Sequence, residues 1–421
     1  MDGRFLPPLR WLFFDMNSFF ASVEQNAHPH LQGRPVGVIP VESESTSLIA
    51  ASLEAKRAGC KTGTPVWQAR EMCPDIAILK ARPAEYVKVH RKLLDACDLH
   101  VPVCKVYSID EWSVRLMPAE ESIEVATDLV RRVKGQIAKN VGACIRASAG
   151  IAPTRLLAKI AADSQKTDGL TVLNVDQLPN KLADHEMRDL PGISEAMEAR
   201  LERAGVHTVA DLWAISRPEA RRIWGSVTGE HWWYGFHGID VPEPGNHRSV
   251  VGHSNVLEPK YRNEEGARAM MIRLLCKAAS RIRHYGYFAF GLSLCIRHDC
   301  GRVWADRIGL NGVQDTPTIL TQFARLWQRR QKMRQHLVER REFVGSPMKV
   351  SVDLSGLERD ANVPATLFDA LDRPRRLSFA MDQINRRYGP HTMFFGSMHS
   401  CREHMDDKIA FGRIPDEILP M

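Results

Sequence analysis

The sequence predicts an α+β protein with more than one domain, and three observations support this fold class. The chain has 421 residues, enough for roughly two to four domains. Short apolar strand patterns alternate with helical patterns along residues 10–174. A Pro- and Gly-rich polar stretch at residues 239–249 then reads as a linker, and further helix and strand patterns follow it.

The first part of the chain predicts a sheet domain that carries an insertion. An apolar run from Trp11 to Phe14 predicts a buried strand that ends on Asp15. The helix that follows has Ser18 as its candidate N-cap, and residues 28–80 form the expected insertion. The later elements are a helix at 84–97, a hairpin at 104–116, a helix at 126–141, a strand at 143–152 and a helix at 153–166 with Pro153 near its first turn.

Residues 187–213 contain two short helical patterns after a Leu-Pro-Gly-Ile turn. This pattern resembles a helix–hairpin–helix element, whose tight turn lets backbone N–H groups approach a phosphate. Gly192 and Ser194 in the turn are the candidate DNA contacts, although many such turns carry a second glycine where Ser194 stands. An ordinary pair of antiparallel helices is the alternative.

The segment after the linker is strongly basic. From Val251 to Gly345 there are 17 Lys and Arg against 8 Asp and Glu, a difference of +9 that exceeds the +7 of the whole chain. This balance indicates a polyanionic partner, with Arg281 and Arg283 as candidate DNA contacts; a solvated helical face is the alternative. The expected elements are helices at 264–286 and 316–337 and strands at 287–298, 302–310 and 349–358.

Composition argues against several other classes. The nine cysteines are scattered without a CxxC pair, so neither a zinc site nor a disulfide framework is indicated. No apolar run approaches the ~18 residues that a membrane span needs, and the N-terminal segment does not have the pattern of a signal peptide. We therefore expect a cytoplasmic protein with no membrane partner.

Three carboxylates stand where they can carry chemistry. Asp15 follows the first strand, and Asp110 and Glu111 are adjacent in the break of the hairpin. Adjacent acids repel each other, but Mg²⁺ takes carboxylate oxygens and keeps positions for phosphates. Converging acids can hold two such ions ~3.5–4 Å apart for phosphoryl transfer. Strand-terminal surface charges are the alternative reading.

Two clusters of cations complement these acids. Lys159 and Lys166 lie on and just after the helix at 153–166, and a second group contains Lys56, Arg57 and Lys61. A triphosphate needs such cations around its β and γ oxygens. Exposed surface lysines are the alternative.

Together, these segments resemble the Y-family (translesion, UmuC/DinB-like) DNA polymerases. FFDMNSFFASVEQ, EAKRAGCKTGTPVWQAREMCP, YSIDEW, SAGIAPTRLLAKIAADSQKTDG and LPGIS occur in the family's order and at about its spacing. VVGHSNVL resembles the start of the family's little-finger domain, so the resemblance covers residues from 10 to 350 or further. It implies a right-hand polymerase: palm at 1–27 and 81–174, fingers at 28–80, helix–hairpin–helix thumb at 175–238, linker at 239–249, little finger at 250–360 and C-terminal tail at 361–421.

The resemblance implies low-fidelity, template-directed addition of deoxynucleotides to a primer end, as in the response to DNA damage. Asp15, Asp110 and Glu111 match the ligands of two Mg²⁺ ions, with the Met16 carbonyl as a further ligand. Phe20 matches the aromatic steric gate that rejects a 2′-hydroxyl. Residues matched to triphosphate contacts are Phe19, Lys56 and Lys166. The implied partners are primer-template DNA and a dNTP, bound by a monomer.

The sequence departs from the family pattern at several positions. Many members carry Tyr and Arg where this chain has Leu53 and Lys56, which predicts weaker nucleotide binding because the planar guanidinium fork is lost. Asn17 stands where many members carry Asp. Trp112 is bulkier than the usual residue after the Asp-Glu pair, and we expect it to crowd the hairpin.

Two readings of the chain remain open at this point. One is an active polymerase; the other is a catalytically weak or inactive relative that acts as a DNA- and clamp-binding adaptor. Retention of the three acids favours the first, and Leu53 weakly favours the second. The segment VPATLFDA resembles a sliding-clamp peptide through Leu367 and Phe368, although Pro364 occupies the expected Gln position. A loop that packs on the little finger is the alternative for this segment.

Overall fold

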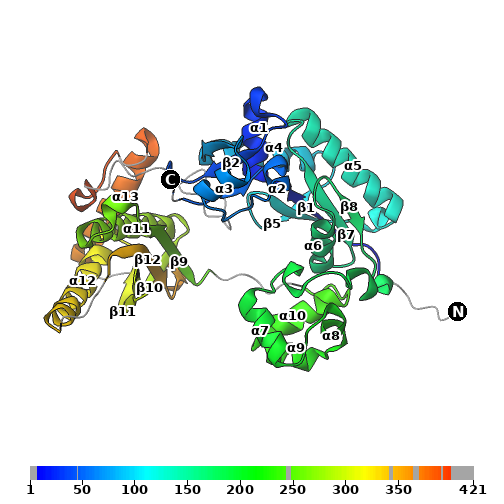
Figure 1. Cartoon of the computed structure of the whole chain (residues 1–421). Coiled ribbons are helices and arrows are strands. Elements are labelled where there is room, and N and C mark those ends of the chain that lie inside the picture. Colours follow the sequence, from blue (N-terminus) through cyan, green and yellow to red (C-terminus); the bar gives the residue numbers. More distant parts are fainter. Residues whose placement is uncertain are drawn as a thin grey trace. The chain divides into compact units, whose positions relative to one another are not determined.

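The structure, a computed structural model, describes residues 7–44, 46–242, 248–340, 345–363, 369–389 and 392–399 (Figure 1). The described chain divides into two compact units, one that ends at residue 242 and one that starts at residue 248. Each unit combines a β-sheet with packed helices, which confirms the predicted α+β class. Within the described ranges, no helix is both long enough and apolar enough to cross a bilayer.

The first unit is built on a five-stranded sheet with β1 at its centre. The strand order is β5 (Val103–Val106), β6 (Glu111–Arg115), β1 (Trp11–Met16), β7 (Ala147–Ala152) and β8 (Leu170–Val172). β1 runs antiparallel to β6 and β7, whereas β7 and β8 are parallel. Every residue of β1 is buried, as expected of a strand covered on both faces.

The two faces of β1 pack into different cores because successive side chains point to opposite sides. Leu12, Phe14 and Met16 enter a core with three helices. Trp11 and Phe13 pack on the other face against α6 (Arg155–Ser164) and the helices that follow it. The helices around this sheet are α1 (Phe19–Ala27), α4 (Pro83–Asp98), α5 (Ile123–Asn140) and α6 (Arg155–Ser164).

Two local expectations need correction, and a third gains detail. Ser18 precedes α1 but has φ 50° and makes no side-chain cap hydrogen bond, so the predicted capping role is wrong. Pro153 directly precedes Thr154, the N-cap of α6, whose hydroxyl accepts a hydrogen bond from Leu157 N. Trp112 does not crowd the hairpin: it is fully buried and stacks on Phe14 with ring centroids 5.5 Å apart.

A smaller sheet is inserted between α1 and α4. Its order is β3 (Ala50–Ala51), β2 (Val36–Ile39) and β4 (Ala77–Lys80), with α2 (Leu53–Arg57) and α3 (Val66–Met72) beside it. This segment has a small core of its own, which includes Ile39, Leu48 and Val66. The insertion therefore has its own apolar core and still belongs to the first unit.

A helical region follows β8 and completes the first unit. Its helices are α7 (Glu195–Arg203), α8 (Val209–Ala214), α9 (Arg217–Trp224) and α10 (Val227–Phe236). The turn between α7 and α8 contains Gly205, whose φ of 80° is a conformation that favours glycine. Leu201 and Leu212 from the two helices meet in the core that also holds Trp11 and Phe13 of β1.

The second unit is a four-stranded antiparallel sheet backed by helices. Its order is β11 (Val303–Val313), β10 (Tyr287–His298), β12 (Pro347–Ser355) and β9 (Val250–Val256), with α11 (Glu264–His284) and α12 (Thr316–Glu339) packed on it. Alternate residues of β10, among them Leu292, Leu294 and Ile296, share a core with these helices. The short elements are β13 (Glu358–Arg359) and the 3-10 turns Pro29–Leu31, Pro118–Glu120, Val175–Gln177, Asn180–Leu182, Met187–Asp189, Pro259–Tyr261 and Asp360–Asn362.

A third helix, α13 (Asp369–Tyr388), belongs to this second unit. Ser378 of α13 accepts a hydrogen bond from Thr316 N at 3.1 Å, and Met398 beyond the helix is buried in the core of the unit. The segment expected to be a tail from residue 361 therefore contributes to the core of the second unit. The linker residues 243–247, the clamp-like Leu367 and Phe368, and residues 400–421 lie outside the described chain.

Candidate active site

Asp15 and Glu111 lie next to each other at the ends of adjacent strands. β1 and β6 pair with Asp15 directly opposite Glu111, and such cross-strand partners project from the same face of a sheet. Alternation along β1 puts Asp15 on the same face as Phe13, which is the face that α6 covers. The strand register alone therefore brings two of the predicted metal ligands together.

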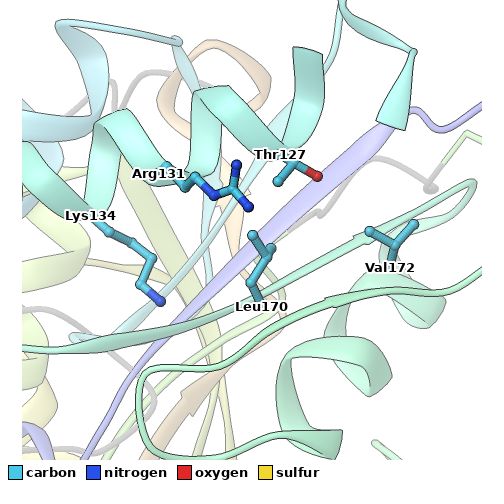
Figure 2. A pocket seen from close by; sticks show the side chains of 5 residues that line it. All are labelled: Thr127, Arg131, Lys134, Leu170 and Val172. Carbon is cyan, nitrogen blue, oxygen red and sulfur yellow. The ribbon is translucent and has the colours of Figure 1, made fainter. Parts of the chain in front are cut away.

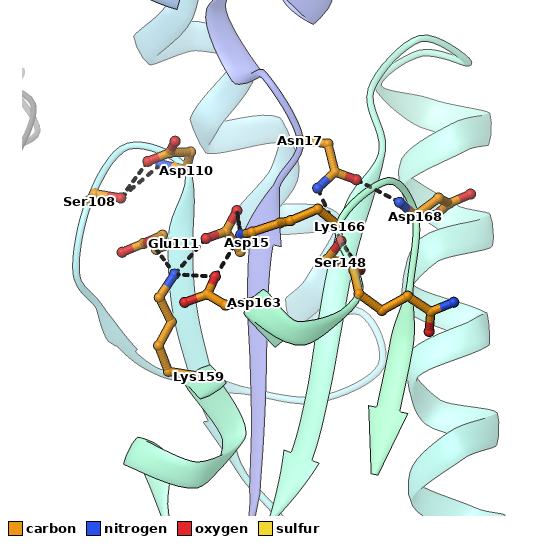
Figure 3. Close-up of polar contacts among 11 residues, drawn as sticks. Asp15, Asn17, Ser108, Asp110, Glu111, Ser148, Lys159, Asp163, Lys166 and Asp168 are labelled. Atoms are coloured by element: carbon orange, nitrogen blue, oxygen red, sulfur yellow. Dashed lines mark hydrogen bonds and ion pairs between the residues drawn. The ribbon is translucent and has the colours of Figure 1, made fainter. Parts of the chain in front are cut away.

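The ammonium group of Lys159 links these carboxylates (Figure 3). Its Nζ lies 2.5 Å from Asp15 Oδ2 and 2.5 Å from Glu111 Oε1. Asp163, one turn further along α6, lies 3.1 Å from the same Nζ through Oδ1. Helix α6 thus brings both a cation and a third carboxylate to the ends of β1 and β6.

Asp110 is held differently from the other two acids. Its backbone carbonyl accepts a hydrogen bond from Met16 N at 2.9 Å, which ties the hairpin to the end of β1. Its carboxylate accepts a hydrogen bond from Ser108 Oγ at 2.5 Å. Figure 3 shows this carboxylate turned toward Ser108 and away from the Lys159 ammonium. The structure therefore places the Asp110 backbone at the site and directs its side chain into its own loop.

Burial and charge shift the pKa values of this cluster. Burial raises the pKa of Asp15, but the ammonium groups of Lys159 and Lys166 outweigh it, so its pKa lies below the usual value. Burial is the main reason why the pKa values of Asp110 and Glu111 are raised. Burial alone would lower the pKa of Lys159, but the surrounding carboxylates raise it and keep the side chain charged. The acids therefore need positive charge beside them.

A divalent cation fits this set of donors. Asp15, Glu111 and Asp163 offer hard carboxylate oxygens, and they already surround one positive group, the Lys159 ammonium. In the part of the chain that the structure describes, no three His, Cys, Asp or Glu side chains form a ready-made metal cage. Instead, the Lys159 ammonium bonds oxygens of three acids, and the Asp110 carboxylate bonds Ser108.

The loop after α6 places a second lysine beside Asp15. Lys166 Nζ lies 3.0 Å from Asp15 Oδ1 and 2.6 Å from Asp163 Oδ1. Two residues that follow, Thr167 and Asp168, have φ of 80° and 61°. Non-glycine residues adopt this left-handed region at a cost and only where the surroundings hold them there. The loop geometry therefore requires fixed contacts, which Asn17 supplies.

Asn17 fastens this loop to the end of β1. Its Oδ1 accepts a hydrogen bond from Asp168 N at 2.7 Å, and its Nδ2 donates to Ser148 Oγ at 3.1 Å. Asn17 is buried, so both bonds are shielded from water. A side chain that differs from the common family residue thus has a defined structural role here.

Helix α2, beside the inserted sheet, carries a third lysine that interacts with Lys166 and Asp15. Lys56 on α2 has a lowered pKa, caused first by partial desolvation and then by the Lys166 ammonium, whereas Asp15 acts in the opposite direction. These interactions place Lys56 within electrostatic range of the acid cluster. Leu53, the first residue of α2, offers only an apolar side chain at this edge.

The two phenylalanines matched to nucleotide contacts are buried in the first unit. Phe19 is 3% exposed and Phe20 is 4% exposed. The Phe20 ring stacks on Tyr86 of α4, with centroids 4.5 Å apart and planes 18° apart. Their roles toward a nucleotide stay predictions.

The candidate DNA contacts are placed unequally. Gly192 and Ser194 are exposed at the start of α7; Gly192 has φ 88°, and the Ser194 hydroxyl makes no cap hydrogen bond. Arg281 on α11 is half-buried, with Nη2 3.4 Å from the hydroxyl of Tyr285. These three residues stay candidates for phosphate contacts.

Arg283 requires a correction. Its side chain is 3% exposed, and its guanidinium bonds Asp382 of α13 at 2.7 Å. It also donates to Gln314 O at 2.7 Å and Thr316 Oγ1 at 3.0 Å. The guanidinium is thus buried and hydrogen-bonded to other residues of the second unit. The predicted contact of Arg283 with DNA therefore does not agree with the structure. The basic composition of α11 did not reveal this, because its partners lie on other elements.

A separate groove of about 420 Å³ lies between α5 and the edge strand β8 (Figure 2). It is lined by Thr127, Arg131, Lys134, Leu170 and Val172. Lys134 is already engaged, because its Nζ donates to Asp168 O at 2.7 Å. The groove shares no lining residue with the acid cluster.

Sequence reasoning missed several side chains around the site. Asp163 bonds Lys159, and Ser108 bonds Asp110. Glu24 on α1 is buried and accepts a hydrogen bond from Tyr86. Asp163 could have been found, because it follows Lys159 at i+4 on one helix face. Glu24 gave no such signal, because its partners Arg82 and Tyr86 come from a distant segment.

Comparisons with known proteins agree with this geometry. A family profile described as the impB/mucB/samB family matches residues 14–163, and one described as the thumb domain of DNA polymerase-iota matches residues 188–240. DNA polymerase IV of Moorella thermoacetica is 33% identical over 390 residues, which cover 90% of this chain and 93% of the relative. DNA polymerase IV of Pelotomaculum thermopropionicum is 30% identical over 393 residues, covering 91% and 93%.

Solved structures show the same fold. A Y-family DNA polymerase chimera of Dbh and Dpo4 has a TM-score of 0.68 at 21% identity, covering 83% of this chain and 99% of the chimera. DinB from Sulfolobus solfataricus has a TM-score of 0.52 at 22% identity with the same coverage. With relatives at 30% identity or more along nine-tenths of its length, the chain belongs to the Y-family of DNA polymerases.

Proposed function

We propose that the chain is an active, low-fidelity DNA-directed DNA polymerase of the translesion type, which adds deoxynucleotides to a primer end. One observation carries this proposal: Asp15 and Glu111 are opposite each other on paired strands and jointly surround a positive charge. A buried Asp15 and a half-buried Glu111 on either side of a cation suit the metal-assisted transfer of a phosphoryl group. The DNA polymerase IV relatives support the same activity.

In this proposal Asp15, Asp110, Glu111 and the Met16 carbonyl would hold two Mg²⁺ ions. When bound, Mg²⁺ supplies positive charge against the attacking oxygen and the leaving pyrophosphate. The buried β1 strand keeps the backbone under Asp15 rigid, which fixes the direction of its carboxylate. The hydrogen bond between Met16 N and the Asp110 carbonyl keeps the hairpin in register with that strand.

Residues beside the acids would orient the incoming nucleotide. We assign Lys166 and Lys56 to the triphosphate, because both interact electrostatically with Asp15 and would face phosphates held at that carboxylate. We also assign Phe19, the first residue of α1, to the triphosphate contacts. Phe20 would lie against the sugar and leave no room for a 2′-hydroxyl.

DNA would be bound mainly through its backbone, independently of sequence. We assign this contact to the exposed turn at Gly192 and Ser194 and to the basic helix at Arg281. Dbh DNA polymerase, which has a similar fold, has been solved as an insertion ternary complex. We propose that the chain acts as a monomer in the cytoplasm and that Leu367 and Phe368 contact a sliding clamp.

The adaptor alternative rests on Leu53, which favours it weakly. An adaptor does not need metal-binding acids. Strand pairing nevertheless places Asp15 opposite Glu111, and Lys159 bonds both of them and Asp163. The contacts of the described residues around these acids add no support for the adaptor.

Primer extension with Mg²⁺ and dNTPs tests the proposal. The wild-type protein should extend the primer, and Asp110→Ala should abolish extension while DNA binding persists. Asp128→Asn, a change at an exposed carboxylate of α5, is the matched control and should extend normally. Absence of extension by the wild type, together with intact DNA binding, would leave the adaptor as the better reading.

A further inference from the structure

Glu24 on α1 is a buried carboxylate with no part in the proposed chemistry. It is 1% exposed. Arg82 holds it with two groups: Nη2 lies 2.6 Å from Oε2, and Nε lies 3.1 Å from both carboxylate oxygens. The hydroxyl of Tyr86 donates to Oε1 at 2.7 Å. Glu24 thus joins Arg82 and Tyr86 at the start of α4 to α1 in one network, and His28 Nδ1 lies 3.5 Å from Glu24 Oε2.

The chemistry of this network makes it stiff. A buried carboxylate is unfavourable unless charged and hydrogen-bonded partners satisfy it, and a guanidinium fork gives the most directional of such contacts. Burial raises the pKa of Tyr86, and its hydrogen bond to Glu24 acts in the same direction, so the phenol keeps the proton that it donates. The hydrogen bond to Glu24 also raises the pKa of Arg82. The hydrogen bonds to Glu24 therefore favour the protonated phenol of Tyr86 and the charged guanidinium of Arg82, which are the forms that donate.

Tyr86 connects this network to Phe20. Its ring stacks on Phe20 with centroids 4.5 Å apart, and Tyr86 itself is fully buried. Phe20 and Glu24 are four residues apart on α1 and lie on one face of that helix. The hydroxyl end of Tyr86 is fixed by Glu24, and its ring face meets Phe20.

We propose that Glu24, Arg82 and Tyr86 are positioning residues that set the place of Phe20 and thereby the strictness of sugar selection. This inference rests on the proposed role of Phe20 against the sugar. A gate that works by lack of room depends on the position of one ring edge, and a displacement of ~1 Å in a catalytic site can change rates by up to ~100-fold. A stack without the anchored hydroxyl would let both rings shift.

The measurable quantity is the ratio of kcat/KM for dCTP to kcat/KM for CTP opposite a template G. Tyr86→Leu removes the stack and the hydroxyl, and we expect the ratio to fall by about tenfold or more. Tyr86→Phe keeps the ring and loses only the hydroxyl, so a smaller fall is expected. Glu24→Gln keeps the size of the side chain but weakens both contacts, and should resemble Tyr86→Phe. A purely structural role would lower the rates for both nucleotides and leave their ratio unchanged.

A double variant tests whether Tyr86 acts through Phe20. If it does, Phe20→Ala with Tyr86→Leu should show the ratio of Phe20→Ala alone, because coupled residues are not additive. Val133→Ala removes buried volume from α5 in the same core. This control should lower stability without changing the ratio. Arg82→Lys keeps the charge at a side chain that is 41% exposed. Its ratio tests the positioning role even if a variant in the buried core does not fold.

The outcomes separate this inference from the proposed function. Polymerase activity in the wild type with an unchanged ratio in Phe20→Ala would overturn both the gate assignment and the positioning role. A relaxed ratio in Phe20→Ala, with unchanged ratios in Tyr86→Leu and Arg82→Lys, would overturn the positioning role alone. Relaxed ratios in all three, with non-additivity in the double variant, would support it.

Discussion

Asn17 Oδ1 accepts the backbone N–H of Asp168 at 2.7 Å, and this hydrogen bond ties the end of the central strand to the loop that carries Lys166. Lys134 holds the same loop from α5, because its Nζ lies 2.7 Å from both the carbonyl and the carboxylate of Asp168. Two contacts from different elements thus stabilise a backbone that Thr167 and Asp168 adopt at a cost. The position of Lys166 beside Asp15 depends on this support.

Asn17→Ala should therefore weaken nucleotide binding more than it slows chemistry. Loss of a buried hydrogen bond costs about 1 kcal/mol, so we expect the KM for dNTP to rise about three- to tenfold, with a smaller change in kcat. Steady-state primer extension measures both. Asn26→Ala removes an amide contact of α1, to Val141 O, and should leave KM unchanged. An unaltered KM in Asn17→Ala would show that the loop does not need this bond.

The fingers offer the opposite experiment, a gain of affinity. Leu53→Tyr together with Lys56→Arg restores a hydroxyl donor and a planar fork at the start of α2, where Lys56 interacts with Lys166 and Asp15. We expect the apparent KM for dNTP to fall by roughly threefold to tenfold. Lys88→Arg makes the same chemical change on the exposed face of α4 and should have no effect. If KM stays the same in the double variant, these positions do not limit nucleotide binding.

The sequence predicted much of the fold because its signals are local. The apolar run before Asp15 and the alternation around Asp110 and Glu111 each lie within one or two elements. Pattern reasoning therefore found the strands, and the family resemblance gave the assignment of their acids. The helices and strands of the second unit were visible in the same way.

What the sequence could not predict depends on contacts between distant segments. Arg283 looked like a solvent-facing cation, but its partner Asp382 lies 99 residues further along the chain. Trp112 looked too large for its hairpin because the space beside Phe14 is created by packing. The direction of the Asp110 carboxylate toward Ser108 is a matter of rotamer, which no spacing rule determines. Each of these three expectations therefore depended on side-chain geometry that sequence patterns do not specify.

The Arg283–Asp382 pair should be a main attachment of α13. Asp382→Ala leaves a buried guanidinium without its carboxylate, and breaking such a pair typically costs about 3–5 kcal/mol. Hydrogen exchange of peptides from α13, measured on the full chain, should become faster by a matching factor. Arg386→Ala changes an exposed residue of the same helix and should leave exchange as in the wild type. Unchanged exchange in Asp382→Ala would mean that apolar packing alone holds α13.

His298 should make the second unit sensitive to mild acid, because its surroundings favour the neutral ring. Arg330 Nη2, which can only donate, lies 3.2 Å from His298 Nε2, so that nitrogen accepts and Nδ1 carries the proton toward Arg302 O. Burial lowers the pKa of His298, and the charge of Arg330 adds to this shift, whereas Glu264 and Asp299 act in the opposite direction. His298 as a whole is 4% exposed.

The sign of the pH effect follows from proton binding. An unfolded histidine binds its proton as the pH falls through about 6.5, while folded His298 still resists. The free energy of unfolding should therefore fall below pH 6.5, by at most about 1.4 kcal/mol per pH unit for one proton. Urea unfolding at pH 7.5, 6.5 and 5.5 should show this loss in the wild type and a smaller one in His298→Gln, whose amide can both accept from Arg330 and donate to Arg302 O. His336→Gln, at an exposed ring of α12, should follow the wild type; equal slopes in all three proteins would contradict the assignment.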